Sequence, residues 1–443
     1  MQILDALAEF IKFLSDWAWG APMLFVFIGT GLYLSFLLGG IQFRALFPAL
    51  KLIFHKETDG EGDISHFAAL TTALASTVGI GNIVGVATAI AMGGPGAVFW
   101  MWISGLVGMA TKYSEAVLAV KYRENGPYGM MGGPMYYLSK GAGLPFLAWL
   151  FALFTLFASF GIGNMTQANS VAVIVDSVFG IRPWVTGSVL MVLAGVVILG
   201  GIRSIGRVTS LLIPFMIVLY VGTGFVILAV NVSSIPSALL LIFKHAFTPF
   251  AAGGGIAGAA VSSAIRYGIA RGVFSNESGL GSAPIAAAAA RTNDPVKQAL
   301  VSMTQTFIDT LVVCTMTALV ILTGESWVTN ISPGELTAVS FSETLGSSGL
   351  YIVSASTCLF ALSTLIGWNY YGEKAAEYLA GSKAVFPYRM IFVSLILFGA
   401  LMKLDLVWNF SDLMNALMAL PNLIALLLLS NVVKKETMRY FIQ

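Results

Sequence analysis

The chain has 443 residues, of which 57% are hydrophobic and only 10% are charged, and its formal net charge is +2. A soluble domain normally carries about 25% charged residues, so this chain does not cover a water-facing surface and must meet lipid over most of its length. The small positive charge, spread among the loops, indicates no nucleic-acid partner.

An amphipathic helix is expected over residues 1–15, where apolar side chains form one stripe. The loops are expected at 51–65, 123–140 and 326–347, where polar, Gly and Pro residues gather. Between and around them lie eleven apolar runs, each near the roughly 20 residues of a spanning helix: 17–40, 66–92, 96–120, 147–178, 184–200, 208–230, 256–290, 296–323, 348–371, 387–403 and 409–432. The sequence thus predicts an all-α polytopic membrane protein of about eleven transmembrane helices.

The distribution of basic residues predicts the orientation of the chain in the cell membrane. If the N-terminus is external, sixteen of the Lys and Arg residues fall on the cytoplasmic side, and four fall outside: Lys12, Arg182, Lys244 and Lys403. Because cytoplasmic loops carry an excess of basic residues, we expect an external N-terminus and a cytoplasmic C-terminus.

Two stretches of the chain resemble each other at a distance of about 200 residues. The segments 78–89 (VGIGNIVGVATA) and 278–289 (SGLGSAPIAAAA) both read Gly-hydrophobic-Gly-polar, followed by small residues. Five spans separate them, an odd number, so the two copies would have opposite orientations. Chance similarity in a Gly-rich chain is the alternative, but Gly-interrupted helices at matching positions of two inverted halves point to the binding site of a secondary transporter.

The glycines in these stretches favour local unwinding, because Gly costs roughly 1 kcal/mol relative to Ala within a helix. Unwound backbone at membrane depth is tolerated where it lines a cavity. Its free carbonyl groups suit a cation, and free N–H groups at the start of the next half-helix suit a carboxylate. Nearby oxygen ligands are offered by Thr77, Asn82 and Ser275.

Three motifs carry a family resemblance over the whole chain. The run Gly93–Gly108 (GGPGAVFWMWISGLVG), with STVGIGN at 76–82 and FSNESGLGSAP at 274–284, resembles the alanine/glycine:cation symporter family. That resemblance implies a leucine-transporter-like fold of two inverted five-helix repeats preceded by one extra helix. The expected parts are 1–45 (amphipathic helix and extra span), 60–231 (first repeat), 250–432 (second, inverted repeat) and 433–443 (cytoplasmic tail).

The same resemblance implies the function and the ligands. It implies sodium-coupled symport of alanine and glycine into the cell by alternating access, with Na⁺ as coupling ion, no other cofactor, no enzymatic reaction and no obligate protein partner. The substrate site would comprise Thr77, Gly79, Gly81, Asn82, Gln167, Phe274, Ser275, Asn276 and Trp368. The sodium ligands would be Ala75, Thr77, Val78, Asn82, Ser275, Phe360, Ser363 and Thr364.

Within these sets the resemblance gives four residues particular roles. Phe274 would form an aromatic lid and Trp368 a wall of the side-chain pocket, while Ser363 and Thr364 would supply the hydroxyl pair of a second sodium site. Gln167 is favoured over Asn164 and Asn169 in the third core helix, where the wider superfamily often has a Tyr that this chain lacks.

Charged residues within spans are functional candidates because their insertion is costly. Lys112 and Glu115, three residues apart, are expected to pair on one helix face near the cytoplasmic end. The others flank or follow the second break: Arg266, Arg271, Glu277 and Asp309. We expect the first three to form an external gate or to neutralise each other. Asp309 would tune the first sodium site or titrate with protons.

Three other functions compete with this interpretation. A proton-coupled carrier of the same fold would use Asp309, Glu277 or His66 as its coupling group. A channel would need a continuous pore, often built by oligomeric symmetry, which inverted repeats in one chain do not favour. No Ser/His, metal-binding or paired-Asp motif indicates an intramembrane enzyme.

Overall fold

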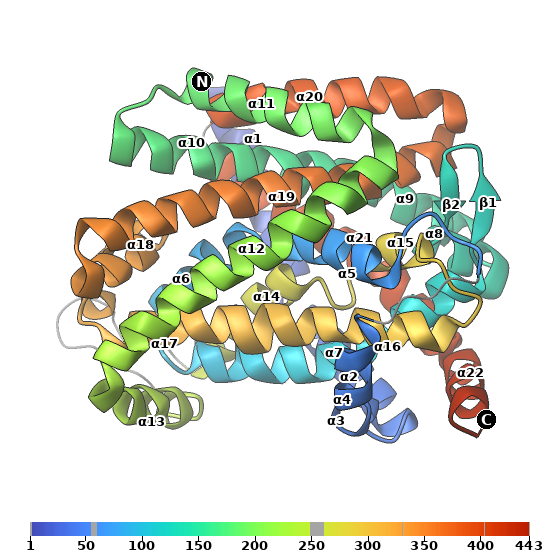
Figure 1. Cartoon of the computed structure of the whole chain (residues 1–443), viewed down its shortest axis with the longest axis horizontal. Helices are drawn as coiled ribbons and strands as arrows, with labels where there is room; N and C mark the ends of the chain where they lie inside the picture. The colour runs from blue at the N-terminus through green and yellow to red at the C-terminus, as the bar shows by residue number, and fades with distance from the viewer. Residues whose placement is uncertain (1, 55–59, 249–260, 330, 403, 443) are drawn as a thin grey trace.

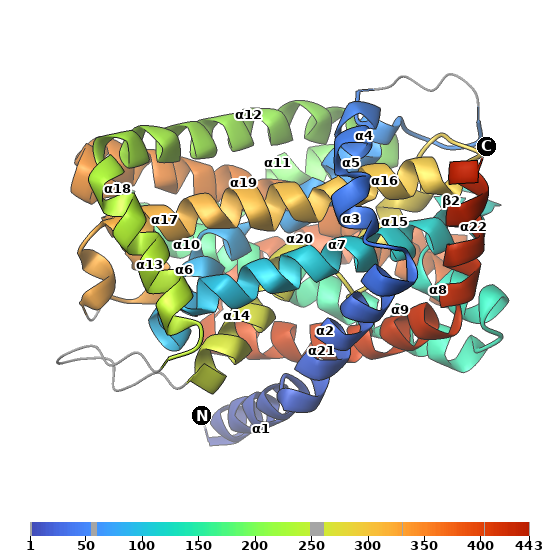
Figure 2. The same cartoon turned by 90° about the horizontal axis from the view of Figure 1, so that it is seen from below.

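The computed structural model describes residues 2–54, 60–248, 261–329, 331–402 and 404–442. Within these ranges the chain is helical apart from one antiparallel hairpin, β1 (Glu124–Gly126) and β2 (Gly129–Met131). The molecule is an elongated bundle, with α13 and α18 at one end and the hairpin and α22 at the other (Figures 1 and 2).

The helices of the first half follow the predicted runs. In chain order they are α1 (Gln2–Ala18), α2 (Ala21–Leu37), α3 (Ile41–Arg44), α4 (Leu46–Leu52), α5 (His66–Thr77), η1 (Ile80–Asn82), α6 (Val84–Gly93), α7 (Ala97–Lys121), α8 (Pro134–Tyr136), η2 (Tyr137–Gly141), α9 (Pro145–Phe160), η3 (Gly161–Met165), α10 (Thr166–Phe179), α11 (Pro183–Leu199), α12 (Gly201–Val230), η4 (Val232–Ser234) and α13 (Ile235–His245).

The second half repeats the pattern with another interrupted helix near its start. Its elements are α14 (Val261–Asn276), α15 (Ala283–Ala288), α16 (Pro295–Thr306), η5 (Phe307–Cys314), α17 (Thr315–Thr323), η6 (Ser326–Val328), α18 (Pro333–Leu345), α19 (Ser347–Ala380), η7 (Ser382–Ala384), α20 (Val385–Leu401), α21 (Leu404–Leu428) and α22 (Ser430–Ile442). The expected start of the second repeat, at residue 250, lies outside the described residues.

Each of the eleven predicted runs coincides with a helix or an interrupted pair in the described part of the chain. Seven of the described helices are long and apolar enough to cross a membrane, and α5 with η1 and α6 forms an eighth span bent by 60°. The predicted loop 326–347 is wrong in part, because α18 begins there with Pro333 at its first position, where a fixed φ favours helix initiation.

The two interrupted helices lie antiparallel in the middle of the bundle. Along the long axis α6 and α14 lie on one side of the breaks, and α5 and α15 lie on the other (Figure 1). Around them, α7 packs against α14 and α16, while α5 packs against α12 and α19. This arrangement brings two chain segments about 200 residues apart to one place.

Candidate functional site

The two breaks are in direct contact. The first follows Thr77, and the amide N–H of Gly79 donates to Asn82 Oδ1 at 2.9 Å. The second contains Gly279 and Gly281, whose φ angles of 90° and 84° favour glycine. A Cβ added to Gly81 would lie 3.3 Å from a ring carbon of Phe274. The small residues therefore let the two unwound segments meet.

Asp309 joins the two breaks through hydrogen bonds. Its Oδ1 accepts from Asn82 Nδ2 at 2.7 Å, and its Oδ2 accepts from Ser275 Oγ at 2.9 Å and from Thr310 Oγ1 at 2.9 Å. The carboxylate is fully buried in η5, a π-helical stretch, and such stretches are frequent at functional sites. The carboxylate and the two hydroxyl oxygens are hard ligands that suit a cation, whereas the Asn82 amide turns its nitrogen to Asp309 and its oxygen to the Gly79 amide.

Thr77 lies beside this group, and Asn276 is bonded to it through Thr310. Thr77 Oγ1 accepts from Gln305 Nε2 at 3.2 Å and donates to Ala73 O at 3.1 Å. The Asn276 side chain donates to Thr310 Oγ1 at 3.0 Å and accepts from its near neighbour Ser278 N at 2.9 Å. Asn276 therefore supports the second break, and both ends of its amide are used by protein groups.

Gln167 and Thr364 lie against the first break from the opposite side. A Cβ on Gly79 would lie 2.5 Å from Thr364 Oγ1 and 3.5 Å from Gln167 Oε1. Gln167 donates from Nε2 to Ile162 O at 3.0 Å, whereas its buried Oε1 has no hydrogen-bond partner within the described structure. A buried polar atom without a partner needs an explanation, and a polar ligand beside Gly79 provides one.

The residues of the expected second sodium site lie where α19 crosses the end of α5. Ser363 Oγ and Thr364 Oγ1 both donate to Phe360 O, at 2.8 and 3.0 Å. Ala75 and Val78 are fully buried. A Cβ on Gly367 would lie 2.8 Å from the backbone nitrogen of Ser76, so α19 approaches the backbone of α5 closely at this level.

Trp368 and Phe274 occupy different layers around the breaks. Trp368 is fully buried, and its Nε1 donates to Glu277 Oε1 at 2.8 Å. Phe274 stacks on Trp408 with ring centroids 5.3 Å apart, and the Arg271 guanidinium lies 5.3 Å from the centroid of the Phe274 ring. Phe274 thus separates the breaks from the outer groups around Arg271.

The three residues expected to form one external gate are separated. Arg271 pairs with Asp412 at 3.0 Å, and both line an outer cavity of about 410 Å³. Arg266 pairs instead with Asp16 on α1 at 2.6 Å, and Glu277 is buried below Phe274. Arg266 and Arg271 line a second outer cavity together, and Glu277 is the one set apart from it. Each arginine pairs with an aspartate, so mutual neutralisation of the three residues is wrong.

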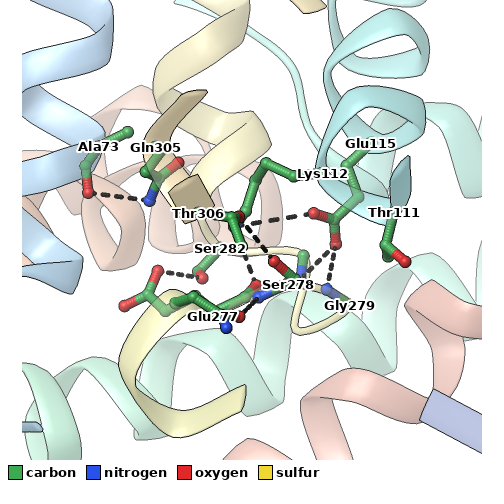
Figure 3. Close-up of polar contacts among 12 residues, drawn as sticks. Ala73, Thr111, Lys112, Glu115, Glu277, Ser278, Gly279, Ser282, Gln305 and Thr306 are labelled. Carbon is green, nitrogen blue, oxygen red and sulfur yellow. Dashed lines mark hydrogen bonds and ion pairs between the residues drawn. The ribbon is translucent and has the colours of Figure 1, made fainter. Parts of the chain in front are cut away.

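A buried carboxylate from α7 holds the second break. Glu115 Oε1 accepts from the amide of Gly279 at 3.1 Å (Figure 3). It also accepts from the amide of Gly281 at 3.1 Å and from Asn422 Nδ2 at 2.7 Å. Lys112 Nζ lies 3.8 Å from Glu115 Oε2 and donates to Glu277 O at 3.0 Å. The expected pair exists, but it is buried at the break and not on a helix face near the cytoplasmic end.

At the end of the molecule near the hairpin, the chain before α5 is tied to the chain after α15. Ile64 and Ala290 form a parallel bridge. The Arg123 guanidinium at the end of α7 donates to the carbonyls of Glu61, Ala288, Ala290 and Thr292 at 2.5–2.9 Å. One planar side chain with several donors thereby closes this end of both broken helices.

The sequence alone did not predict that the site includes Glu115, Gln305 and Arg123. Each acts on a segment far away in the chain, with 165 residues between Arg123 and Ala288. For Glu115 the signal was a charge within a span. For Gln305 and Arg123 no sequence pattern distinguished the residue from its neighbours.

Comparisons with known proteins agree with this architecture. The sequence profile of the sodium:alanine symporter family matches residues 4–443. The chain is 53% identical over 442 residues to the sodium/alanine symporter AgcS of Methanococcus maripaludis, covering 96% of each protein. It is 50% identical to an uncharacterized transporter of Haemophilus influenzae, covering 99% of this chain and 96% of that one.

Among solved structures, the transporter MhsT in complex with L-phenylalanine matches with a TM-score of 0.60 at 12% identity. The match covers 86% of this chain and 99% of that one, and it confirms the leucine-transporter-like fold expected from the sequence. Because the family profile spans the helices, both breaks and the residues around them, the chain belongs to the sodium:alanine symporter family, whose members are cation-coupled amino-acid symporters and not enzymes.

Proposed function

We propose that this protein couples the entry of Na⁺ to the entry of alanine and glycine, with its N-terminus outside the cell and its C-terminus in the cytoplasm. The observation that carries the proposal is Asp309, whose carboxylate contacts Asn82 of the first break and Ser275 of the second. Support for the substrate comes from the family and from the Methanococcus relative, which is named a sodium/alanine symporter.

The surroundings of Asp309 favour a cation as the coupling species. The three side chains that donate to its carboxylate belong to Asn82, Ser275 and Thr310, and all three are neutral. A buried carboxylate needs a counter-charge or a proton. A Na⁺ ion held by the Asp309 carboxylate and by the Ser275 and Thr310 hydroxyl oxygens would supply the charge. Since Asn82 of the first broken helix is bonded to the same carboxylate, the ion would act on both broken helices and so on the substrate site.

A small zwitterion suits the space between Gly79, Gln167 and the second break. Its carboxylate would meet N–H groups at the start of a half-helix and the positive end of the helix dipole. Its ammonium would meet free backbone carbonyls and the unpartnered Gln167 Oε1. The buried rings of Phe274 and Trp368 would leave room for hydrogen or a methyl group and not for a leucine side chain.

Uptake into proteoliposomes tests the proposal. Labelled alanine should accumulate when an inward Na⁺ gradient is imposed, and unlabelled glycine should compete with it. Replacing the Na⁺ gradient with a pH gradient separates sodium from proton coupling. Accumulation that follows the pH gradient and ignores Na⁺ would contradict the proposal and favour the proton-coupled carrier.

A further inference from the structure

Glu277 has an unusual backbone conformation at the second break. Among the described residues it is the only non-glycine residue with a positive φ, 56°. Residues with a Cβ rarely adopt this conformation, and they do so mostly where the surrounding structure fixes them at functional sites. The neighbouring glycines already allow the chain to reverse its direction. The positive φ of Glu277 therefore needs another explanation.

The contacts of Glu277 supply that reason. Its Oε1 accepts from Trp368 Nε1 at 2.8 Å, and its Oε2 accepts from Ser282 Oγ at 2.6 Å. Its main-chain carbonyl accepts from Lys112 Nζ at 3.0 Å. Figure 3 shows the Glu277 side chain directed to Ser282, with its backbone beside Lys112. Side chain and backbone are thus fixed by three separate elements: α7, α15 with its lead-in, and α19.

The bond to Glu277 limits where the Trp368 indole can lie. The backbone side of Trp368 has no free space, because a Cβ on Gly163 would overlap the Cβ of Trp368. Tyr371 contacts the indole edge-on, with ring centroids 5.5 Å apart. The hydrogen bond from Nε1 fixes the far end of the ring system, where packing alone would allow rotation about χ2.

We propose that Glu277 is a positioning residue that sets the size limit of the substrate pocket by holding the Trp368 indole across it. The inference rests on the proposed function, in which Trp368 forms the wall of the side-chain pocket. In addition, two elements form this wall: α19 supplies the Trp368 ring, and the break between α14 and α15 supplies Glu277, which holds the ring. Size selection then depends on the ordered second break.

Four variants separate this role from a structural one. Glu277→Ala removes the anchor, and Trp368→Phe removes the N–H while keeping an aromatic ring. Glu277→Gln keeps an acceptor oxygen and is the conservative variant. Glu373→Gln is the matched control, because Glu373 is a buried acid on α19, the helix that carries Trp368, and its hydrogen bonds come from Arg389 and not from either break.

The measurement is the thermal shift of the purified protein with glycine, alanine, valine, leucine and phenylalanine, combined with competition against alanine uptake. Glu277→Ala and Trp368→Phe should each raise the affinity for leucine relative to alanine by about tenfold, the scale on which pockets discriminate methylenes. The double variant should show little more than either single variant, since both remove one interaction. Glu277→Gln and Glu373→Gln should keep the wild-type ratio.

An unchanged leucine-to-alanine ratio in Glu277→Ala would overturn the inference, whatever happens to the transport rate. If that variant does not fold, an unchanged ratio in Trp368→Phe overturns it instead. The thermal shift is measured with Na⁺ present throughout and needs no transport. A wild-type protein that shows no sodium-driven alanine uptake would contradict the proposed function, while a changed size profile in Glu277→Ala would still support the positioning role.

Discussion

Asp309 Oδ1 accepts a hydrogen bond of 2.7 Å from Asn82 Nδ2, which joins the π-helical turn η5 to the first broken helix. Ser275 Oγ, from the second broken helix, donates to the other oxygen of the same carboxylate. The Asp309 side chain thereby contacts both halves of the inverted repeat. An ion bound there would be sensitive to the relative position of the two breaks.

Asp309→Asn should raise the Na⁺ concentration for half-maximal alanine uptake by about tenfold to a hundredfold. The amide keeps the shape but removes the charge, and a charge pair at contact distance in a protein is worth a few kcal/mol. The measurement is the Na⁺ dependence of uptake in proteoliposomes. Asp176→Asn, which changes an exposed acid on α10, is the control; equal Na⁺ dependence in the two variants would exclude Asp309 as a ligand.

The second sodium site gives a separate prediction. The double variant Ser363→Ala/Thr364→Ala should raise the Na⁺ concentration for half-maximal uptake by about three- to tenfold. Expression should fall little, because both hydroxyls donate only to Phe360 O in the described structure and net hydrogen-bond contributions are about 1 kcal/mol. Thr357→Ala, which removes a hydroxyl donating to Val353 O on the same helix, is the control. Unchanged sodium activation would remove this site from the mechanism.

The sequence predicted the two breaks, but it did not predict which residues contact them. The glycines at 79, 81, 279 and 281 revealed both interruptions, because unwinding depends on local residue types. The partner Asp309 was named as a charged candidate, but its contacts with Asn82 and Ser275 depend on η5. A π-helix changes the angular spacing of side chains, and no residue pattern indicates where that change begins.

Arg123 illustrates the same limit at the end of the molecule near the hairpin. The sequence shows a basic residue after a span, which predicts the side of the membrane and nothing about its partners. Its guanidinium reaches four backbone carbonyls, and backbone groups carry no sequence signal. The fold class is therefore readable from composition and motifs, while the residues that close the ends are visible only once the helices are packed.

Arg123→Lys should weaken closure of that end. Lysine keeps the charge but lacks the planar group that donates to several carbonyls at once. If at least one bond is lost, the balance between closed and open forms should shift roughly tenfold towards open. The readout is the labelling rate of a cysteine introduced at Ala289, which is fully buried and accepts hydrogen bonds from the amides of Asp63 and Ile64 at this closure, in a background without Cys314 and Cys358. Lys121→Arg, which retains a cation facing Glu436, should leave the rate unchanged.

Asp412→Asn should open the outer entrance more often. Arg271 and Asp412 are mostly buried, at 16% and 15% exposure, but lie beside an outer cavity, and pairs near solvent contribute about 0.2–1 kcal/mol. Labelling of a cysteine at Ser170, a buried residue that lines that cavity, should become about two- to fivefold faster. The swapped variant Arg271→Asp/Asp412→Arg should recover part of the slow rate; recovery no better than the single change would argue against the pair as a gate.

Two substitutions should change the pocket size in opposite directions. Trp368→Ala removes a fully buried indole and should admit leucine, improving its competition against alanine by about tenfold, with weaker alanine binding because contacts are lost. Gly163→Ala adds a methyl group that overlaps the Cβ of Trp368. Since an overpacked site must shift its neighbours, the indole should move into the pocket and disfavour alanine relative to glycine.

Competition by glycine, alanine, serine and leucine against labelled alanine measures both effects in one assay. Gly187→Ala is the matched control for Gly163→Ala, because a Cβ there would also be crowded, at 2.7 Å from the Cβ of Ala400, but between α11 and α20 and away from the breaks. It should lower stability without changing the order of the competitors. If Trp368→Ala and Gly163→Ala leave that order as it is in the wild type, Trp368 packs the core without bounding the substrate, and the small-substrate argument loses its physical basis.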